Sequence, residues 1–237
     1  MITKAFLLAA GLGTRLRPFT DKVPKCLVPI YDKPLLGWWI DLLEKHGVEE
    51  VLINLHHLGD QVTAFINSYP TIIKFRFFYE EKLLGSAGTL RDNKEFIKNE
   101  KAFFILYADN LTNYDLTLFS EFHEKSNLPF SMALFETTKP QMCGIAELDE
   151  NDVVTSFEEK PKYPKSSLAN AGLYIAKPEI LDLIPGLEIT DIGFHLLPQL
   201  VGKMAGWRSN NYLIDIGTID NLNKANNEWL SIINKGI

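Results

Sequence analysis

A glycine-rich turn near the beginning of the sequence carries residue types that could bind a phosphate. The apolar run from Phe6 to Ala9 leads into Gly11-Leu12-Gly13-Thr14-Arg15, and Lys25 follows among prolines. Small residues let the backbone come close to a phosphate, while Arg and Lys supply fixed positive charge. This stretch therefore predicts a nucleoside triphosphate held over the end of a strand.

Two aspartates follow apolar strands that are far apart in the sequence. Asp109 comes after the run 103–107, and Asp215 comes after the run 212–214. Ligands of open α/β sheets bind at the carboxyl ends of strands, so both positions suit a ligand site. No His or Cys lies nearby, and a carboxylate pair joined by substrate phosphates is the ligand set that Mg²⁺ prefers. The pattern predicts Mg²⁺ at Asp109 and Asp215, with a capping role for Asp109 as the alternative.

No side chain stands out as a general base, and this bears on the reaction class. A sugar phosphate, with a second pKa of about 6 by analogy with phosphorylated side chains, is already an ionised nucleophile at neutral pH. An alcohol acceptor would need a carboxylate or a histidine to take its proton, and none of the 5 histidines is placed for that. With cations at Arg15, Lys25 and Lys160, the pattern favours nucleotidyl transfer onto a phosphate over phosphorylation of a hydroxyl group.

The elements that must position these residues alternate between strands and helices. Apolar and alternating runs predict strands at 6–9, 51–55, 72–79, 103–107, 131–136, 144–148, 153–157, 169–175 and 212–214. Helical spacing predicts helices at 34–46, 59–68, 116–125, 178–184, 192–202 and 219–233. This order indicates a parallel sheet with helices on both faces, within one domain that spans residues 1–237.

Two helix starts carry polar residues suited to capping. Ser86, in the second small-residue turn Leu84–Thr89, is expected to cap the helix that follows this turn. Thr190 or Asp191 is expected to cap the helix predicted at 192–202.

Composition excludes several classes of protein and of site. The chain has 237 residues and a formal net charge of -6, which gives no basic surface for nucleic acid or an anionic membrane. Cys26 and Cys143 are isolated, so disulfides and a zinc site are not expected. No apolar run reaches the roughly 18 residues of a membrane helix, and the N-terminus does not match a signal peptide. We expect a cytoplasmic protein and leave a homo-oligomer open.

Taken together, these motifs resemble those of the sugar-1-phosphate nucleotidyltransferases, over essentially the whole chain. The matching motifs, in the family's order, are Gly11–Thr20 with Pro24-Lys25, Leu84–Thr89, Asp109, Glu159-Lys160-Pro161, Asn170–Gly172 and Asp215–Thr218. The resemblance implies a single Rossmann-like three-layer α/β domain with a mainly parallel central sheet. It also implies a small β-hairpin subregion over the sugar site, and a short form without a left-handed β-helix domain.

The resemblance also implies roles for individual residues. The nucleotide would be held by Leu8, Ala10, Gly11, Gly13, Thr14, Arg15, Gly85 and Gly88. The sugar phosphate would be held by Gly144, Glu159, Lys160, Asn170 and Gly172. The catalytic residues would be Arg15, Lys25, Asp109 and Asp215, of which the two aspartates would hold Mg²⁺. The substrates would be a nucleoside triphosphate and a sugar-1-phosphate, and the product pyrophosphate.

The identity of the base and of the sugar is less well defined by the sequence. The turn Leu84–Gly88 is most similar to that of guanylyltransferases that act on mannose-1-phosphate or a heptose-1-phosphate, which favours GTP. One alternative is transfer from dTTP, UTP or CTP to a sugar-1-phosphate or to another phosphate-bearing acceptor. Another is a nucleotide-sensing module without turnover. Departures from the family pattern at Cys26, Ala108, Leu213 and Ile219 remove no charge from the expected chemistry. An NAD-dependent oxidoreductase is disfavoured, because the turn at 11–15 lacks the third glycine of that fingerprint.

Overall fold

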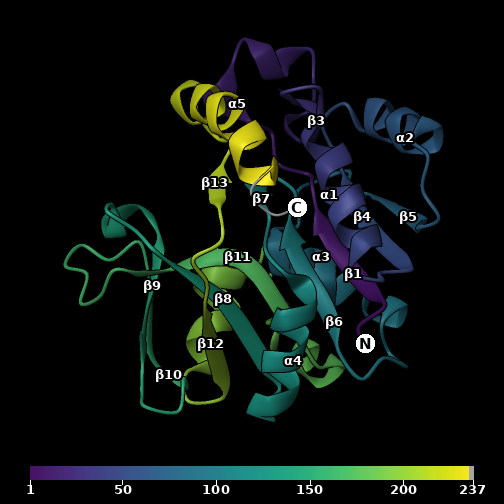
Figure 1. Ribbon diagram of the computed structural model, residues 1–237. Helices are drawn as coiled ribbons and strands as arrows, with labels where there is room; N and C mark the ends of the chain where they lie inside the picture. The colour runs from purple at the N-terminus through teal and green to yellow at the C-terminus, as the bar shows by residue number, and fades with distance from the viewer. Residues whose placement is uncertain (235–237) are drawn as a thin grey trace. The chain divides into compact units, whose positions relative to one another are not determined.

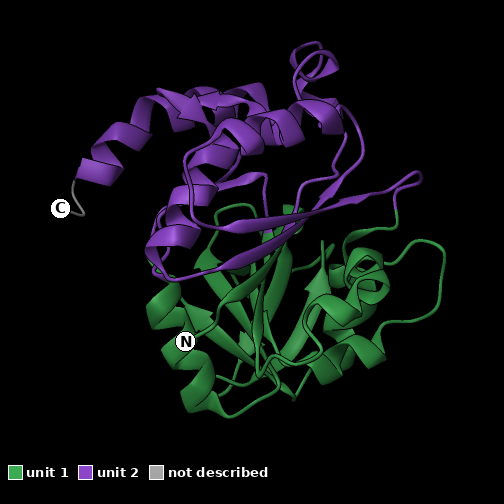
Figure 2. Cartoon of the chain, turned by 90° about the vertical axis from the view of Figure 1, so that its right-hand side faces the viewer, with its two compact units in different colours: residues 1–6, 84–106, 116–210 green, residues 7–83, 107–115, 211–237 purple. Residues whose placement is uncertain are grey.

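The computed structural model describes residues 1–234, and its strands and helices alternate along the chain largely as predicted (Figure 1). The chain divides into two compact units (Figure 2). Unit 1 contains residues 1–6, 84–106 and 116–210, and unit 2 contains residues 7–83, 107–115 and 211 onward. The single domain expected over residues 1–237 stays a prediction, and its last residues, 235–237, lie outside the described part of the chain.

Unit 1 is built on a mixed sheet. Its main elements are α3 (Ser86–Asp92), β6 (Phe103–Tyr107, whose last residue belongs to unit 2), α4 (Leu116–Ser126), β8 (Phe130–Glu136), β9 (Gly144–Leu148), β10 (Val154–Glu159), β11 (Leu168–Ala176) and β12 (Met204–Arg208). Strand β11 runs antiparallel to β6, β8 and β9, whereas β12 runs parallel to β8. Strands β9 and β10 form the predicted hairpin, which places Glu159 opposite Gly144.

Unit 2 combines parallel strands with a small antiparallel ladder. Its elements are the end of β1 (Lys4–Leu8), β2 (Pro29–Ile30), β3 (Lys33–Pro34), α1 (Leu35–Lys45), β4 (Glu50–Leu55), α2 (Gly59–Ser68), β5 (Lys74–Tyr79), β7 (Asn110–Thr112), β13 (Leu213–Asp215) and α5 (Ile219–Ile233). Strands β4 and β5 are parallel, and β13 pairs with β7 in the antiparallel sense. The expected α/β class with a mainly parallel central sheet is confirmed, and β11 is a strand of opposite direction within it.

Local sequence explains most of these elements. Helix α1 buries an apolar stripe that includes Leu36, Trp39 and Leu43, each at most 2% exposed, and the chain leaves the helix through Gly47 with a φ of 76°. Helix α5 is capped by Thr218, whose side chain accepts a hydrogen bond from the Asn221 N–H, and the helix buries Trp229. Within the described residues, no helix has the length and apolar character needed to cross a membrane.

Three expectations from the sequence were wrong. The helix expected at 178–184 is a 3-10 helix (Pro178–Leu183). The helix expected at 192–202 is a π-helical turn (Ile192–Leu196) followed by a 3-10 turn (Leu197–Leu200), because Pro198 has no N–H with which to continue an α-helix. Ser86 does not cap α3, because it is the first residue of the helix and the N-cap is Gly85, with a φ of 78°. The hydroxyl of Ser86 instead donates to Asp191 Oδ2 at 2.9 Å. Of the two caps considered for the second segment, Asp191 is confirmed, since its side chain accepts from the N–H groups of Gly193 and Phe194.

Candidate functional site

In unit 2, the ammonium group of Lys25 lies between two carboxylates. Lys25 Nζ is 2.6 Å from Asp109 Oδ2 and 3.0 Å from Asp215 Oδ1, and Arg15 Nη2 is 3.3 Å from Asp215 Oδ2. The Lys25 side chain is only 8% exposed, whereas the side chains of Asp109 and Asp215 are 39% and 42% exposed. The structure therefore brings together the four residues expected to be catalytic, with the carboxylates accessible and the lysine buried.

The ladder between β7 and β13 explains why two aspartates so far apart in sequence meet. Asp215 pairs with Asn110, the residue after Asp109, and the Ile216 N–H donates to the Asp109 carbonyl at 2.9 Å. The indole N–H of Trp39, which is buried in α1, donates to the Asn110 carbonyl at 2.8 Å. Backbone pairing and one buried indole thus hold both aspartates, so their side chains need no direct bond to each other.

The glycine-rich turn lies in the same unit and is held by its own hydrogen bonds. Gly13 has a φ of 61°, a left-handed conformation that favours glycine. The hydroxyl of Thr20, which is 1% exposed, donates to the Gly13 carbonyl at 2.8 Å. At the start of the turn, the Ala9 N–H donates to Asn54 Oδ1 at 2.6 Å. The turn keeps its shape through buried partners, which leaves its outer face for Thr14 and Arg15.

Gly217 keeps space beside the charged cluster. A Cβ atom added at Gly217 would lie 2.5 Å from Arg15 Nη2 and 2.8 Å from both carboxylate oxygens of Asp215. Contacts of that length are too short for real side chains, so a side chain at position 217 would displace Arg15 or the Asp215 carboxylate from its present place. This gives a steric reason for the glycine in the Asp215–Thr218 motif.

The pKa values in the cluster favour a charged lysine and a neutral thiol. Burial alone lowers the pKa of Lys25, but the charges and hydrogen bonds of Asp109 and Asp215 outweigh burial, so the pKa of Lys25 is raised. Burial, followed by the smaller effect of Asp109, raises the pKa of the Cys26 thiol to about 12. Lys25 therefore stays an ammonium group at neutral pH and cannot serve as a general base, and Cys26 is not a nucleophile.

The donor set of this cluster fits a hard divalent cation. The charges of Lys25 and Arg15 are matched by those of Asp109 and Asp215, so a triphosphate arriving here would also meet two carboxylates. A divalent cation held by Asp109 and Asp215 would remove that repulsion, and two carboxylates with phosphate oxygens are what Mg²⁺ prefers. Both carboxylates also reach solvent, which leaves them accessible to such an ion.

The residues expected to bind the sugar phosphate all lie in unit 1, where glycines surround the carboxylate of Glu159. A Cβ atom added at Gly144 would lie 2.5 Å from Glu159 Oε2, and one added at Gly193 would lie 2.7 Å from the same oxygen. The side chain of Glu159 is 15% exposed. Burial raises the pKa of Glu159; the ammonium of Lys160 opposes this shift, and the charge of Asp191 adds to it.

We expect Glu159→Gln to stabilise the protein at neutral pH while impairing any binding of a sugar phosphate. Because the pKa of Glu159 is raised in the folded state, its ionisation costs stability as the pH rises through that pKa, and this cost is absent below the ordinary carboxyl pKa. The free energy of unfolding, measured with urea between about pH 4 and pH 8, should exceed that of the wild-type protein by an amount that grows with pH. The variant Glu158→Gln, at the exposed neighbouring position, is the control for removing one carboxyl group from this end of the hairpin. A gain of the same size at every pH would contradict this assignment.

The other expected sugar-side residues are Asn170, Gly172 and Lys160, and their local geometry is well defined. Gly172 has a φ of 72°, and its N–H donates to Asn170 Oδ1 at 2.9 Å. The amide nitrogen of Asn170 donates to the Tyr174 hydroxyl at 2.7 Å, at an irregularity in the pairing of β11 with β8. Lys160 also has a positive φ of 53°, and its Nζ lies 3.9 Å from Glu159 Oε1. The side chain of Asn170 is thus engaged in holding its own strand.

The second glycine turn packs against a segment that sequence reasoning noted only as a helix start. A Cβ atom added at Gly85 would lie 2.4 Å from the Thr190 carbonyl oxygen, which also accepts from the N–H groups of Ala87 and Gly88. Asp191 and Gly193 follow directly, and both lie against the Glu159 side of unit 1. The sequence offered one indication of these two residues, namely that the expected helix cap Asp191 is followed two positions later by a glycine.

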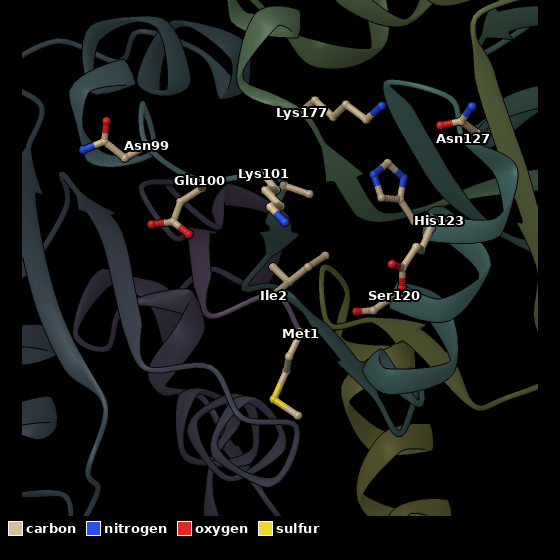
Figure 3. A pocket seen from close by; sticks show the side chains of 11 residues that line it. Met1, Ile2, Asn99, Glu100, Lys101, Ser120, His123, Asn127 and Lys177 are labelled. Atoms are coloured by element: carbon tan, nitrogen blue, oxygen red, sulfur yellow. The ribbon is translucent and has the colours of Figure 1, made fainter.

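A separate cavity in unit 1 contains none of the residues expected to bind substrates (Figure 3). It has a volume of about 540 Å³, and Lys101, His123 and Lys177 are among the residues that line it. His123 Nδ1 lies 2.8 Å from Ser131 Oγ, and burial, followed by the charge of Lys177, lowers the pKa of His123 to about 4. His123 is therefore a neutral, buried histidine outside the candidate site.

Comparison with known proteins links this geometry to one family. A family model described as Nucleotidyl transferase matches residues 4–231. The UTP–glucose-1-phosphate uridylyltransferase of Synechocystis sp. is 31% identical over 236 residues, which are 91% of this chain and 60% of that protein. The mannose-1-phosphate guanyltransferase of Yarrowia lipolytica is 29% identical over 220 residues, which are 90% of this chain and 60% of that protein. The chain thus spans about 60% of the length of these curated relatives.

A solved structure matches along its whole length. The crystal structure of HddC from Yersinia pseudotuberculosis complexed with GMP-PN superposes with a TM-score of 0.81 at 25% sequence identity. The match covers 96% of this chain and 100% of that chain. This likeness confirms the expected Rossmann-like fold.

Proposed function

Because the chain belongs to the nucleotidyl transferase family, and within it to the sugar-1-phosphate nucleotidyltransferases, we propose that it transfers a nucleoside monophosphate from a nucleoside triphosphate to a sugar-1-phosphate. The products are pyrophosphate and a nucleotide sugar. GTP is the favoured nucleotide, a hexose- or heptose-1-phosphate is the acceptor, and the reaction takes place in the cytoplasm.

The observation that carries this proposal is the cluster of Lys25 with Asp109 and Asp215. Each carboxylate lies within 3.0 Å of the same ammonium nitrogen, beside the glycine-rich turn that ends on Arg15. Fixed cations next to accessible carboxylates suit phosphate chemistry, in which positioning and neutralisation of charge supply most of the catalysis. A thiol-based mechanism finds no support here, because burial keeps the thiol of Cys26 neutral.

In the proposed reaction, an oxygen of the acceptor phosphate forms a bond to the α-phosphorus, and the bond from that phosphorus to the β-phosphate bridging oxygen breaks. Lys25 remains protonated throughout and offsets the negative charge that gathers between the two phosphates. Arg15 orients the triphosphate from the glycine-rich turn, whose backbone, with Leu8, Ala10 and Gly13, faces the nucleotide. The acceptor phosphate is already ionised, so no proton has to be removed from it.

Asp109 and Asp215 would hold Mg²⁺, which when bound supplies charge neutralisation at the α-phosphate. In unit 1, Glu159 would accept hydrogen bonds from sugar hydroxyl groups, and Lys160 would meet the acceptor phosphate. Gly144, Asn170 and Gly172 would shape that pocket, while Gly85 and Gly88 would let the nucleotide approach the backbone.

Support for GTP comes from the second turn and from some relatives. The turn Leu84–Gly88 is similar to that of guanylyltransferases, one relative is named a mannose-1-phosphate guanyltransferase, and HddC was solved with GMP-PN. The uridylyltransferase relative keeps UTP as an alternative, and dTTP and CTP are further alternatives. One base contact is worth only about 1–3 kcal/mol, so the preference has to be measured.

A substrate panel tests the proposal. GTP, ATP, UTP, CTP and dTTP are each incubated with mannose-, glucose-, N-acetylglucosamine- and heptose-1-phosphate in the presence of Mg²⁺, and pyrophosphate release is measured. We expect turnover with GTP and at least one sugar-1-phosphate, and none when the acceptor is left out. Binding of a nucleotide without turnover for every pair would favour a nucleotide-sensing module instead.

A further inference from the structure

We infer that Asp191 is a positioning residue that couples the turn Leu84–Thr89 to the carboxylate of Glu159, so that contacts on the nucleotide side set the affinity for the sugar phosphate. This inference rests on the proposed function for the roles of the two ends. The connection between them rests on hydrogen bonds within unit 1 alone.

The first step of the connection joins the second glycine turn to the segment 190–192. The Thr190 carbonyl accepts from the N–H groups of Ala87 at 2.9 Å and Gly88 at 3.1 Å, and the Thr190 N–H donates to the Leu84 carbonyl at 2.8 Å. The Ser86 hydroxyl donates to Asp191 Oδ2 at 2.9 Å and accepts from the Ile192 N–H at 2.8 Å. The hydroxyl of Ser86 therefore acts as a donor and as an acceptor toward the same segment.

The second step joins Asp191 to the backbone that encloses Glu159. Asp191 Oδ1 accepts from the N–H groups of Gly193 at 2.8 Å and Phe194 at 3.3 Å. Gly193 lies directly against Glu159, since a Cβ atom added to it would be 2.7 Å from Oε2 and 3.1 Å from Cδ. One carboxylate thus binds the nucleotide-side turn through Oδ2 and the wall of the sugar-side site through Oδ1.

The segment 190–192 is also held by the loop that precedes it, and this limits how far the segment can move. Thr190 is fully buried, and Arg91 Nη1 donates to the carbonyl of Leu187 at 2.7 Å and to that of Pro185 at 3.1 Å. A shift of Ser86 would accordingly be carried to Gly193 through Asp191 more readily than it would be absorbed by the loop before Thr190. Packed interiors transmit such shifts because they contain little free space.

The test measures the KM for the sugar phosphate in variants on the nucleotide side. We expect Ser86→Ala, which leaves Glu159 and its glycines unchanged, to raise the KM for mannose-1-phosphate about fivefold at saturating GTP. If the panel selects another pair, that pair replaces these substrates. Asp191→Ala should raise this KM further, and Asp191→Asn should restore part of the loss, since an amide oxygen can still accept from Gly193. A change confined to the KM for GTP would overturn the inference.

Asp149→Asn is the matched control. Asp149 Oδ1 accepts from the N–H groups of Asn151 at 2.9 Å and Val153 at 2.8 Å, the same kind of contact that Asp191 makes, but in the turn between β9 and β10. That turn lies at the end of the hairpin away from Glu159 and Gly144. Both KM values should stay at the wild-type level in this variant, which separates positioning from a general loss of one capped turn.

A second measurement does not depend on turnover. Ser86→Ala and Glu159→Gln are combined in a double-mutant cycle, and the urea midpoint is measured for each variant. We expect non-additive effects, although neither side chain is a hydrogen-bond partner of the other, because Asp191 and Gly193 connect them. Additive effects would overturn the coupling. The two proposals can fail separately. If the effects are non-additive but no substrate pair in the panel is turned over, the coupling stands and the proposed function is wrong.

Discussion

Asp109→Asn is expected to lower kcat for pyrophosphate release by about 10³-fold or more, while the protein stays folded. Asparagine keeps the shape of the side chain but removes the charge that faces both Lys25 and the proposed Mg²⁺. The backbone ladder of β7 and β13 and the Trp39 indole bond hold the position of residue 109, so the loss should be chemical rather than structural. Activity is measured by pyrophosphate release, and folding by circular dichroism.

The dependence of turnover on Mg²⁺ separates a metal ligand from other roles of Asp109. The Mg²⁺ concentration for half-maximal rate should rise in the variant, and a chelator should abolish turnover of the wild-type protein. The control is Asp41→Asn, which removes another aspartate of unit 2 that pairs with a lysine and is 45% exposed, but lies outside the cluster. Unchanged turnover in Asp109→Asn, or an unchanged Mg²⁺ requirement, would remove the metal assignment.

Lys25→Met is expected to lower kcat by about 10²–10³-fold, the usual cost of losing one preorganised group that stabilises developing charge. Methionine fills a similar volume but leaves Asp109 and Asp215 facing each other without the ammonium group. Lys25→Arg, which keeps the charge, should recover part of the activity. Lys33→Met is the control, because Lys33 pairs with Asp41 and lies 4.0 Å from the centre of the Trp38 ring, outside the cluster.

The same variant has an expected signature in stability. Removing the buried ammonium group should cost about 1–3 kcal/mol at neutral pH, less than for a fully buried ion pair, because both carboxylates are about two-fifths exposed. The pKa of Lys25 is raised, so its contribution is fully present below the ordinary lysine pKa and is lost only as the pH rises through the higher folded value. The difference in the free energy of unfolding between the wild-type protein and the variant should therefore stay constant between about pH 6 and pH 9 and shrink only above the ordinary lysine pKa. A difference that already shrinks between about pH 7 and pH 9 would contradict this account of the cluster.

Sequence pattern alone determined the local elements of this protein and the residue types of its candidate site. Helices α2 and α5 and strand β9 have the bounds expected from periodicity and from their terminal residues. The glycines at 13, 85 and 172 all have a positive φ, a property that belongs to each turn by itself. These features depend on neighbours within a few positions, and such neighbours are visible in a linear sequence.

Tertiary structure decided the contacts within the site, including the position of Lys25 between the two aspartates that the sequence predicted to share Mg²⁺. Lys25 contacts partners 84 and 190 positions away, at Asp109 and Asp215, and this contact follows from the register of β7 with β13. The link from Ser86 to Asp191 spans 105 positions and replaces the local cap that was expected. A residue's own neighbours specify its conformation, but strand register and packing specify its distant partners. Register and packing in turn depend on how the buried surfaces of the whole unit fit together.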